Sequence, residues 1–152
     1  MTWGDAAVAT MLVASIMDYG MFCIGAEVPF MIYDAKKKEV KALSGLGGAP
    51  LNKDDIKWYY EHAIPGNGGI KAVPVPGAVG LFFDALVVYG TKDFATVVAP
   101  ALRILDGGGQ DWYDKLAATF RRLLEAEDRK EGTRVAKLKA ARARFYTGDI
   151  AE

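Results

Sequence analysis

Apolar residues dominate the start of the chain. The stretch AAVATMLVASIM, residues 6–17, lies between Asp5 and Asp18 and has apolar side chains on every side of a helix. Such a helix is normally buried on most of its faces, so we predict a helix enclosed by other parts of the protein. The stretch is shorter than the ~20 residues that cross a membrane. No basic segment precedes it, so it makes a poor signal peptide. We expect no membrane span, and a cytoplasmic location is favoured.

The next apolar segments predict a β-hairpin. Residues 30–33 form the first strand, DAKKK (34–38) the turn, and residues 40–43 the second strand. Both strands are mostly apolar, which is typical of a sheet covered on both faces. Because two strands alone do not form a stable sheet, we expect the hairpin to belong to a larger assembly.

Helical patterns fill most of the remaining chain. We predict helices over 53–61, 78–89, from 93 or 94 through Pro100, 111–129 and 133–145. Asn52 and Thr91 are the predicted N-caps of the first and third of these, the third opening at Asp93 or Phe94. Pro100 predicts a kink or a break in that helix. The fold class is α+β, mostly helical with one β-hairpin.

Residues 63–80 are rich in glycine and proline and predict an irregular segment. Ile64, Ile70, Val73 and Val75 are too apolar for a disordered linker, so we expect an ordered, buried loop.

Composition excludes several classes of function. The 152 residues amount to one domain. The 19 basic and 19 acidic residues cancel, so no overall field attracts nucleic acid. A single cysteine and a single histidine leave too few ligands for a structural zinc site and exclude an internal disulfide. We expect no metal, no cofactor and no nucleic-acid partner.

Individual residues offer little chemistry on their own. His62 has no evident partner and is predicted to be a surface or capping residue, and Cys23 a small core residue. Thr2 is either an N-terminal nucleophile or simply the start of a helix, and we favour the second interpretation. The basic residues of segment 134–144 are expected to form a solvated face.

Five segments, in order, resemble the γ-glutamyltransferase (γ-glutamyltranspeptidase) family. They are GDAAVAT (4–10), CIGAEVPFMIYDAKKKEV (23–40), LSGLGGAP (43–50), the stretch from VPVPG to APALRI (73–104), and ARFYTGDIAE (143–152). The resemblance implies an N-terminal nucleophile hydrolase with a four-layer αββα fold. It matches part of the large, N-terminal subunit only, so residues 1–152 are expected to form a single partial domain.

The family's nucleophile is a threonine freed by self-cleavage, downstream of anything that resembles this chain. The resemblance therefore implies no catalytic residue here, and a second chain or segment that carries the threonine and the central strands. It also implies a small-molecule amide or peptide-like substrate, which is hydrolysed or passed to an acceptor. The alternative is a non-catalytic remnant that acts as a scaffold or binding subunit.

Two departures from the family bear on the substrate. The family segment LDGRETAP has an arginine that resembles a clamp for the glutamyl α-carboxylate, and Leu46 stands there in this chain. Losing such a paired contact costs on the order of 2–5 kcal/mol, so we expect an acyl group without that carboxylate. The second departure is Glu27, in a run where the family has glycines. Glu27 is expected either to meet a substrate amine or to pair with an arginine elsewhere. The predicted wall of the pocket comprises the loops 25–29 and 44–50, with Glu27, Ser44, Gly45, Leu46 and Gly47 as substrate-binding residues.

Overall fold

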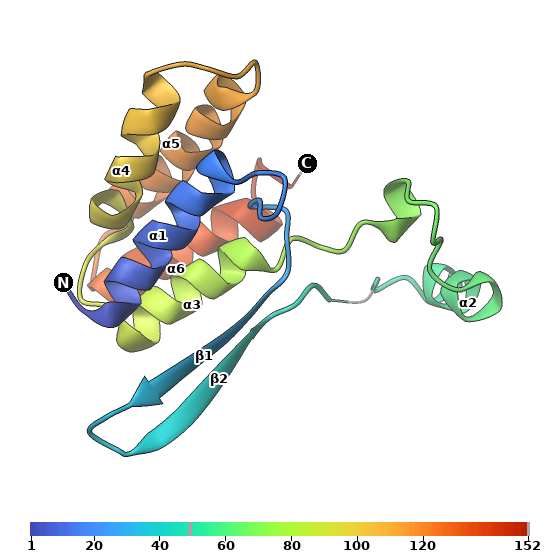
Figure 1. Ribbon diagram of the computed structural model, residues 1–152, viewed down its shortest axis with the longest axis horizontal. Coiled ribbons are helices and arrows are strands. Elements are labelled where there is room, and N and C mark those ends of the chain that lie inside the picture. Colours follow the sequence, from blue (N-terminus) through green and yellow to red (C-terminus); the bar gives the residue numbers. More distant parts are fainter. Residues whose placement is uncertain (49, 152) are drawn as a thin grey trace. The chain divides into compact units, whose positions relative to one another are not determined.

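The computed structural model describes residues 1–48 and 50–151, which form an α+β structure (Figure 1). In chain order the elements are α1 (Trp3–Met17), β1 (Val28–Asp34), β2 (Glu39–Gly45), α2 (Lys53–His62), the 3₁₀ helix η1 (Ile70–Ala72), α3 (Ala78–Tyr89), α4 (Phe94–Asp106), α5 (Tyr113–Arg129) and α6 (Arg134–Thr147). The predicted class, mostly helical with one β-hairpin, is confirmed. The chain divides into a helical unit, residues 1–24 and 82–152, and a hairpin unit, residues 25–81.

The helical unit is a bundle in which α4 and α5 each contact two other helices. Helix α1 contacts α4, α4 contacts α5, and α5 contacts α6. Four phenylalanines are buried at the centre of the unit: Phe82, Phe83, Phe94 and Phe120. The rings of Phe83 and Phe94 lie 4.9 Å apart between centroids and join α3 to α4. Burying each such side chain contributes about 1.5–3 kcal/mol, so these residues account for much of the stability of the unit.

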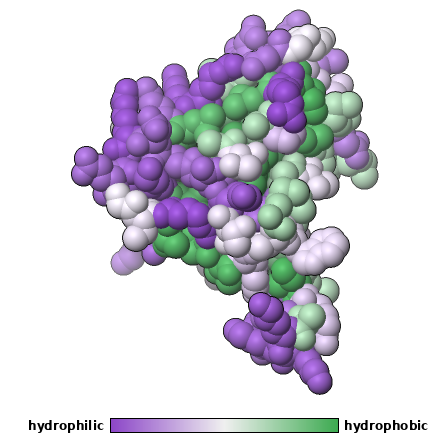
Figure 2. All heavy atoms as spheres, turned by 90° about the vertical axis from the view of Figure 1, so that its left-hand side faces the viewer, coloured by the Kyte–Doolittle hydropathy of each residue, from purple (hydrophilic) through white to green (hydrophobic). Residues whose placement is uncertain are grey.

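Helix α1 is buried along one stripe. Val8, Leu12 and Ile16, spaced four residues apart, are at most 1% exposed, whereas Trp3 is 87% exposed. The expectation of a helix enclosed on nearly all sides is wrong for the described part of the chain, because its helices cover one face of α1 only. Apolar side chains reach the surface among hydrophilic ones on the face that Figure 2 presents. Among the described residues, no helix combines the length and the apolar character that crossing a membrane requires.

Side-chain caps fix where the helices begin. Asn52 caps α2 by accepting the N–H of Asp54 at 2.8 Å, as predicted. The cap of α4 is Asp93, which accepts the N–H of Thr96 at 2.9 Å. The prediction of Thr91 as this cap is wrong, because the Thr91 hydroxyl donates to Asp5 instead. Helix α4 runs through Pro100, so of the predicted kink or break, the break is absent.

The hairpin unit contains the predicted pair of strands in antiparallel register. Phe30 lies opposite Leu43, and Tyr33 lies opposite Val40. The turn is stabilised by Asp34, whose carboxylate accepts the N–H groups of Lys36 and Lys37. Tyr33 and Val40 are 61% and 63% exposed, so the expected cover on both faces of the sheet is wrong within the described residues.

The segment after α2 is ordered by polar and aromatic contacts. The Tyr59 hydroxyl donates to the carbonyl of Lys71 at 2.7 Å, and the Lys71 ammonium lies 3.6 Å from the centroid of the Trp58 ring. Ile64 and Ile70 are 71% and 85% exposed. Val73 and Val75 are exposed as well, so the prediction of burial is wrong for all four apolar residues on which it rested.

Candidate functional site

The predicted wall residues lie where β1 begins and β2 ends. Gly45, the last residue of β2, pairs with Val28 and is buried, and Ser44 pairs with Pro29 and is exposed. Leu46 follows directly and is 58% exposed. We call residues 46–48 the Leu46 loop. Ala49, which belongs to the predicted segment 44–50, lies outside the described residues.

Glu27 is bonded to the Leu46 loop. Its Oε1 accepts the N–H of Gly47 at 2.6 Å. This bond joins the residue before β1 to the loop after β2. Leu46 is therefore held on both sides, by the strand pairing of Gly45 and by the carboxylate on Gly47.

A third segment passes so close to the loop that side chains are excluded. A Cβ atom on Gly77 would lie 2.6 Å from the carbonyl carbon of Gly45 and closer still to its oxygen. A Cβ on Gly47 would meet the carbonyl oxygen of Val75. Glycine alone allows backbones to approach this closely. Ala78 also donates its N–H to the carbonyl of Ala26 at 3.0 Å, so segment 75–78 supports both predicted loops.

The chemistry that this arrangement offers is limited. Of the five predicted wall residues, Glu27 provides a charge, Ser44 a hydroxyl and Leu46 an apolar surface. None of these groups can form the paired, charge-assisted bonds by which an arginine binds a carboxylate. The wall can therefore shape a pocket, bind a cation or contact an apolar group.

A second polar cluster surrounds the α3–α4 turn, residues 90–93. Asp5 of α1 is fully buried, and its carboxylate accepts the N–H groups of Thr91 at 2.9 Å, Lys92 at 3.0 Å and Thr2 at 2.7 Å. The hydroxyl of Thr91 donates to it as well. Burial alone would raise the pKa of this carboxyl, but the backbone hydrogen bonds outweigh burial and hold its pKa far below the ordinary value. Asp5 is therefore an ionised anchor for the turn.

Two more charged side chains bind the helix ends at this turn. Glu127 of α5 accepts the N–H groups of Phe94 at 2.8 Å and Ala95 at 3.0 Å, at the start of α4. Burial raises the pKa of Glu127, against the effect of these two bonds. Arg134 of α6 donates to the carbonyls of Leu86, Gly90 and Lys92 at 2.8–3.0 Å. The end of α3 and the start of α4 thus both have partners for backbone groups that a helix leaves unpaired.

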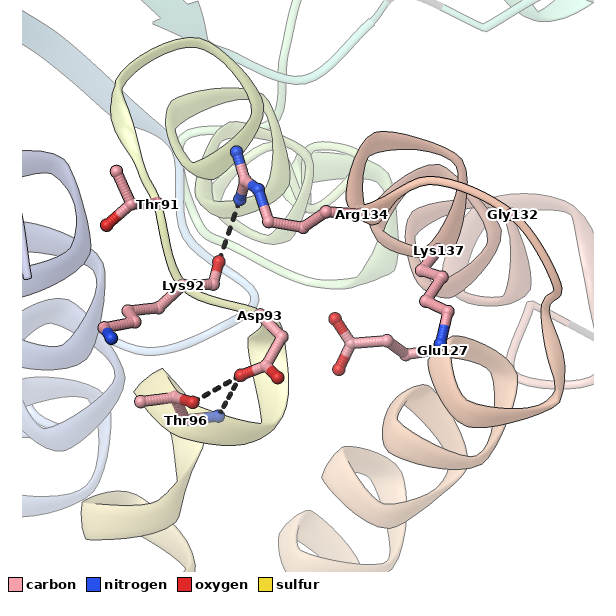
Figure 3. A pocket seen from close by; sticks show the side chains of 8 residues that line it. All are labelled: Thr91, Lys92, Asp93, Thr96, Glu127, Gly132, Arg134 and Lys137. Carbon is pink, nitrogen blue, oxygen red and sulfur yellow. Dashed lines mark hydrogen bonds between the residues drawn. The ribbon is translucent and has the colours of Figure 1, made fainter.

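The same residues line an open cavity of about 440 Å³ (Figure 3). Its lining residues are Thr91, Lys92, Asp93, Thr96, Glu127, Gly132, Arg134 and Lys137. Asp93 binds Thr96, while Glu127 and Arg134 bind backbone groups. Because three of its five charged side chains stabilise the turn, we interpret this cluster as structural. Among the described residues, no group of three or more His, Cys, Asp or Glu side chains is arranged to hold a metal ion.

The predicted solvated face of α6 is present at Lys139 and Arg142, which are exposed, but its arginines also have partners. Arg134 binds three carbonyls, Arg142 lies 3.6 Å from Asp84, and Arg144 binds Glu125 and Asp149 at 2.7 Å each. These arginines tie α6 to α3, to α5 and to the turn that follows α6. The prediction therefore holds only in part, because Arg134 and Arg144 are partly buried and bind backbone or carboxylate groups.

The remaining candidates are also placed. Thr2 is the N-cap of α1 and donates its hydroxyl to the Tyr89 carbonyl at 2.7 Å, as the favoured interpretation requires. His62 is exposed, stacks on Trp58 with 4.7 Å between ring centroids, and lies 2.9 Å from the Trp58 carbonyl. Cys23 is exposed, so its prediction as a core residue is wrong. The sequence analysis missed Asp5, although Asp5 and Thr91 both lie in segments that carry the family resemblance.

Comparison with known proteins agrees with that resemblance. The family model described as gamma-glutamyltranspeptidase matches residues 4–147. The chain therefore belongs to the gamma-glutamyltranspeptidase family. A solved structure described as "Structure of LmbA2991T421A" is similar, with a TM-score of 0.77 and 25% sequence identity. The match covers 99% of this chain and 32% of that chain, so this chain spans about a third of its length. A comparison with curated proteins finds no match.

Proposed function

We propose that this chain is the non-nucleophilic part of a γ-glutamyltransferase-like amide hydrolase or acyltransferase. A threonine at the N-terminus of a partner chain, or of another segment, attacks the amide carbonyl, and its own amine accepts the hydroxyl proton. The amine leaving group departs with a proton, and the acyl-enzyme then passes to water or to an amine acceptor. The observation that supports this proposal is the family match over residues 4–147, combined with cover of only 32% of a similar solved chain.

In this proposal the whole protein is an N-terminal nucleophile hydrolase with a four-layer αββα fold, and residues 1–152 are one partial domain of its large subunit. The hairpin adds to the central strands supplied by the rest of a heterodimer. This chain contributes one wall of the acyl pocket through Glu27, Ser44, Gly45, Leu46 and Gly47. The exposed, uncharged Leu46 supports an acyl donor that has no carboxylate at that position.

The first experiment is intact-mass spectrometry with N-terminal sequencing of every species in the native protein, purified from cells that carry its whole gene. We expect a companion species that begins with threonine, and amidase activity in the same fraction. A preparation without such a species and without amidase activity would contradict the proposal. It would favour the alternative, a scaffold or binding subunit.

A Leu46→Arg variant tests the role of the loop. We expect the kcat/KM for a γ-glutamyl anilide, relative to that for a 4-aminobutyryl anilide, to rise at least tenfold, about 1.4 kcal/mol. The two donors differ only in the α-carboxylate that the new guanidinium would bind. Leu51→Arg is the matched control, because Leu51 is 99% exposed and outside the described wall. An unchanged ratio in Leu46→Arg would remove the loop from the pocket.

A further inference from the structure

We infer that Glu27 is a specificity-determining residue, which selects an acyl donor that carries an amine without an adjacent carboxylate. This inference rests on the proposed function and deepens it by naming the charge of the substrate. The effect of Glu27 differs from the effect of losing the family's arginine. Loss of the arginine leaves the wall neutral, whereas Glu27 makes it negative.

The hydrogen bond to the loop fixes the position of this charge. Glu27 Oε1 is 2.6 Å from the N–H of Gly47, the residue that follows Leu46, so the carboxylate lies beside the wall residue that replaces the family's arginine. Glu27 is exposed, and its Oε2 accepts no hydrogen bond from the described residues. One oxygen thus positions the loop, and the other is available to a ligand.

The loop does not need the charge of Glu27 to hold its position. A neutral amide oxygen accepts a backbone N–H with similar geometry, so anchoring Gly47 does not need a carboxylate. Lys41, on the same hairpin, lies 3.1 Å from Glu39 in an ion pair of its own. Within the described residues, no lysine or arginine forms an ion pair with Glu27. Such a site attracts an ammonium group and repels a second carboxylate.

Four chromogenic anilides that share a four-carbon acyl chain and differ in its terminal substituents separate the contributions of the two charges. They are the γ-glutamyl (amine and carboxylate), 4-aminobutyryl (amine only), glutaryl (carboxylate only) and butyryl (neither) donors. For the complete wild-type protein we expect the highest kcat/KM with 4-aminobutyryl and the lowest with glutaryl. In Glu27→Gln, which retains an acceptor for Gly47, the ratio of 4-aminobutyryl to butyryl should fall about five- to tenfold.

Controls separate the inference from the proposed function. Glu39→Gln removes a half-exposed carboxylate from the same hairpin and should leave the ratio unchanged. High salt should lower the wild-type ratio and spare the Glu27→Gln ratio, because a solvent-accessible pair is screened. Failure to cleave any of the four donors would overturn the proposed function. Cleavage with the same ratio in wild type and Glu27→Gln would overturn the inference alone, and would assign Glu27 to pairing with an arginine elsewhere.

Discussion

Replacing Asp5 with asparagine tests the idea that one buried carboxylate stabilises the α3–α4 turn. Oδ1 accepts the N–H groups of Thr91 and Lys92, and Oδ2 accepts the N–H of Thr2 and the hydroxyl of Thr91. An asparagine has one carbonyl oxygen, so its NH₂ group must face at least one N–H donor. The variant keeps the size of the side chain and removes half of its accepting capacity.

The magnitude follows from these bonds. A hydrogen bond to a charged group contributes about 1.5–3 kcal/mol and a neutral one about 0.5–1.5, so two retained bonds each lose about 1 kcal/mol. A buried N–H without a partner adds about 1–3 kcal/mol, and relief from burying a charge offsets part of the total. The depressed pKa of Asp5 indicates that the bonds outweigh burial. We expect a net loss of about 3 kcal/mol, or a Tm lower by about 6–12 °C for a domain of this size.

Urea denaturation followed by circular dichroism measures the loss, and hydrogen exchange at the Thr91 and Lys92 amides shows where it arises. The control is Asp114→Asn in the first turn of α5, which is exposed and should change stability by a few tenths of a kcal/mol. The Asp5 contribution is present above the unfolded pKa of about 3.9 and disappears as pH falls toward the lower folded pKa. The stabilities of wild type and variant should therefore begin to converge below about pH 4. A loss below about 1 kcal/mol, or unchanged exchange at both amides, would refute the reasoning.

Three further variants test the other side chains at the α3–α4 turn and the close approach of Gly77 to Gly45. Glu127→Gln should cost less than about 1 kcal/mol at pH 7, because the raised pKa of Glu127 means that burial opposes its charge. The folded protein binds this proton more tightly than the unfolded chain. The free energy of unfolding of the wild type should therefore fall as pH rises above about 4.3. Denaturation at pH 4.5 and at pH 7 should show a smaller fall for the variant. Arg134→Met should lose about 2 kcal/mol by urea denaturation, because three carbonyls lose a charged donor, and equal stability would contradict that role. Gly77→Ala should destabilise the hairpin unit by about 3 kcal/mol, seen as faster hydrogen exchange in β2, whereas Gly66→Ala, with open space around it, should not.

Features set by neighbouring residues could be predicted from the sequence. The hairpin follows from two apolar runs around DAKKK, and the strands pair as expected, with Phe30 opposite Leu43. Asn52 caps α2 because its side chain reaches an N–H two residues away. The replacement of an arginine by Leu46 was visible once the surrounding segment was matched to the family.

Features set by distant residues could not be predicted. Thr91 and Asp93 are both good N-cap residues, and Asp5, 86 residues before Thr91, decides between them by engaging the Thr91 hydroxyl. The bond from Gly47 to Glu27 spans 20 residues and leaves no local pattern. Burial was predicted least well, because an apolar sequence such as that of α1 indicates what a helix can bury and not how much of it is covered.

The contacts of Arg134 at the α3–α4 turn also set an order of events during synthesis. Arg134 contacts carbonyls 42–48 positions earlier in the chain, so the turn has its full set of partners only after the ribosome has added the start of α6. Closing loops of this length costs entropy before any contact compensates for it, which places completion of the turn late in folding. Until Arg134 has emerged, the carbonyls of Leu86, Gly90 and Lys92 lack their charged donor, so the turn gains this part of its stability last. We expect a nascent chain that ends before α6 to be more prone to aggregation than the complete chain, because the side chains of α3 are nearly all apolar.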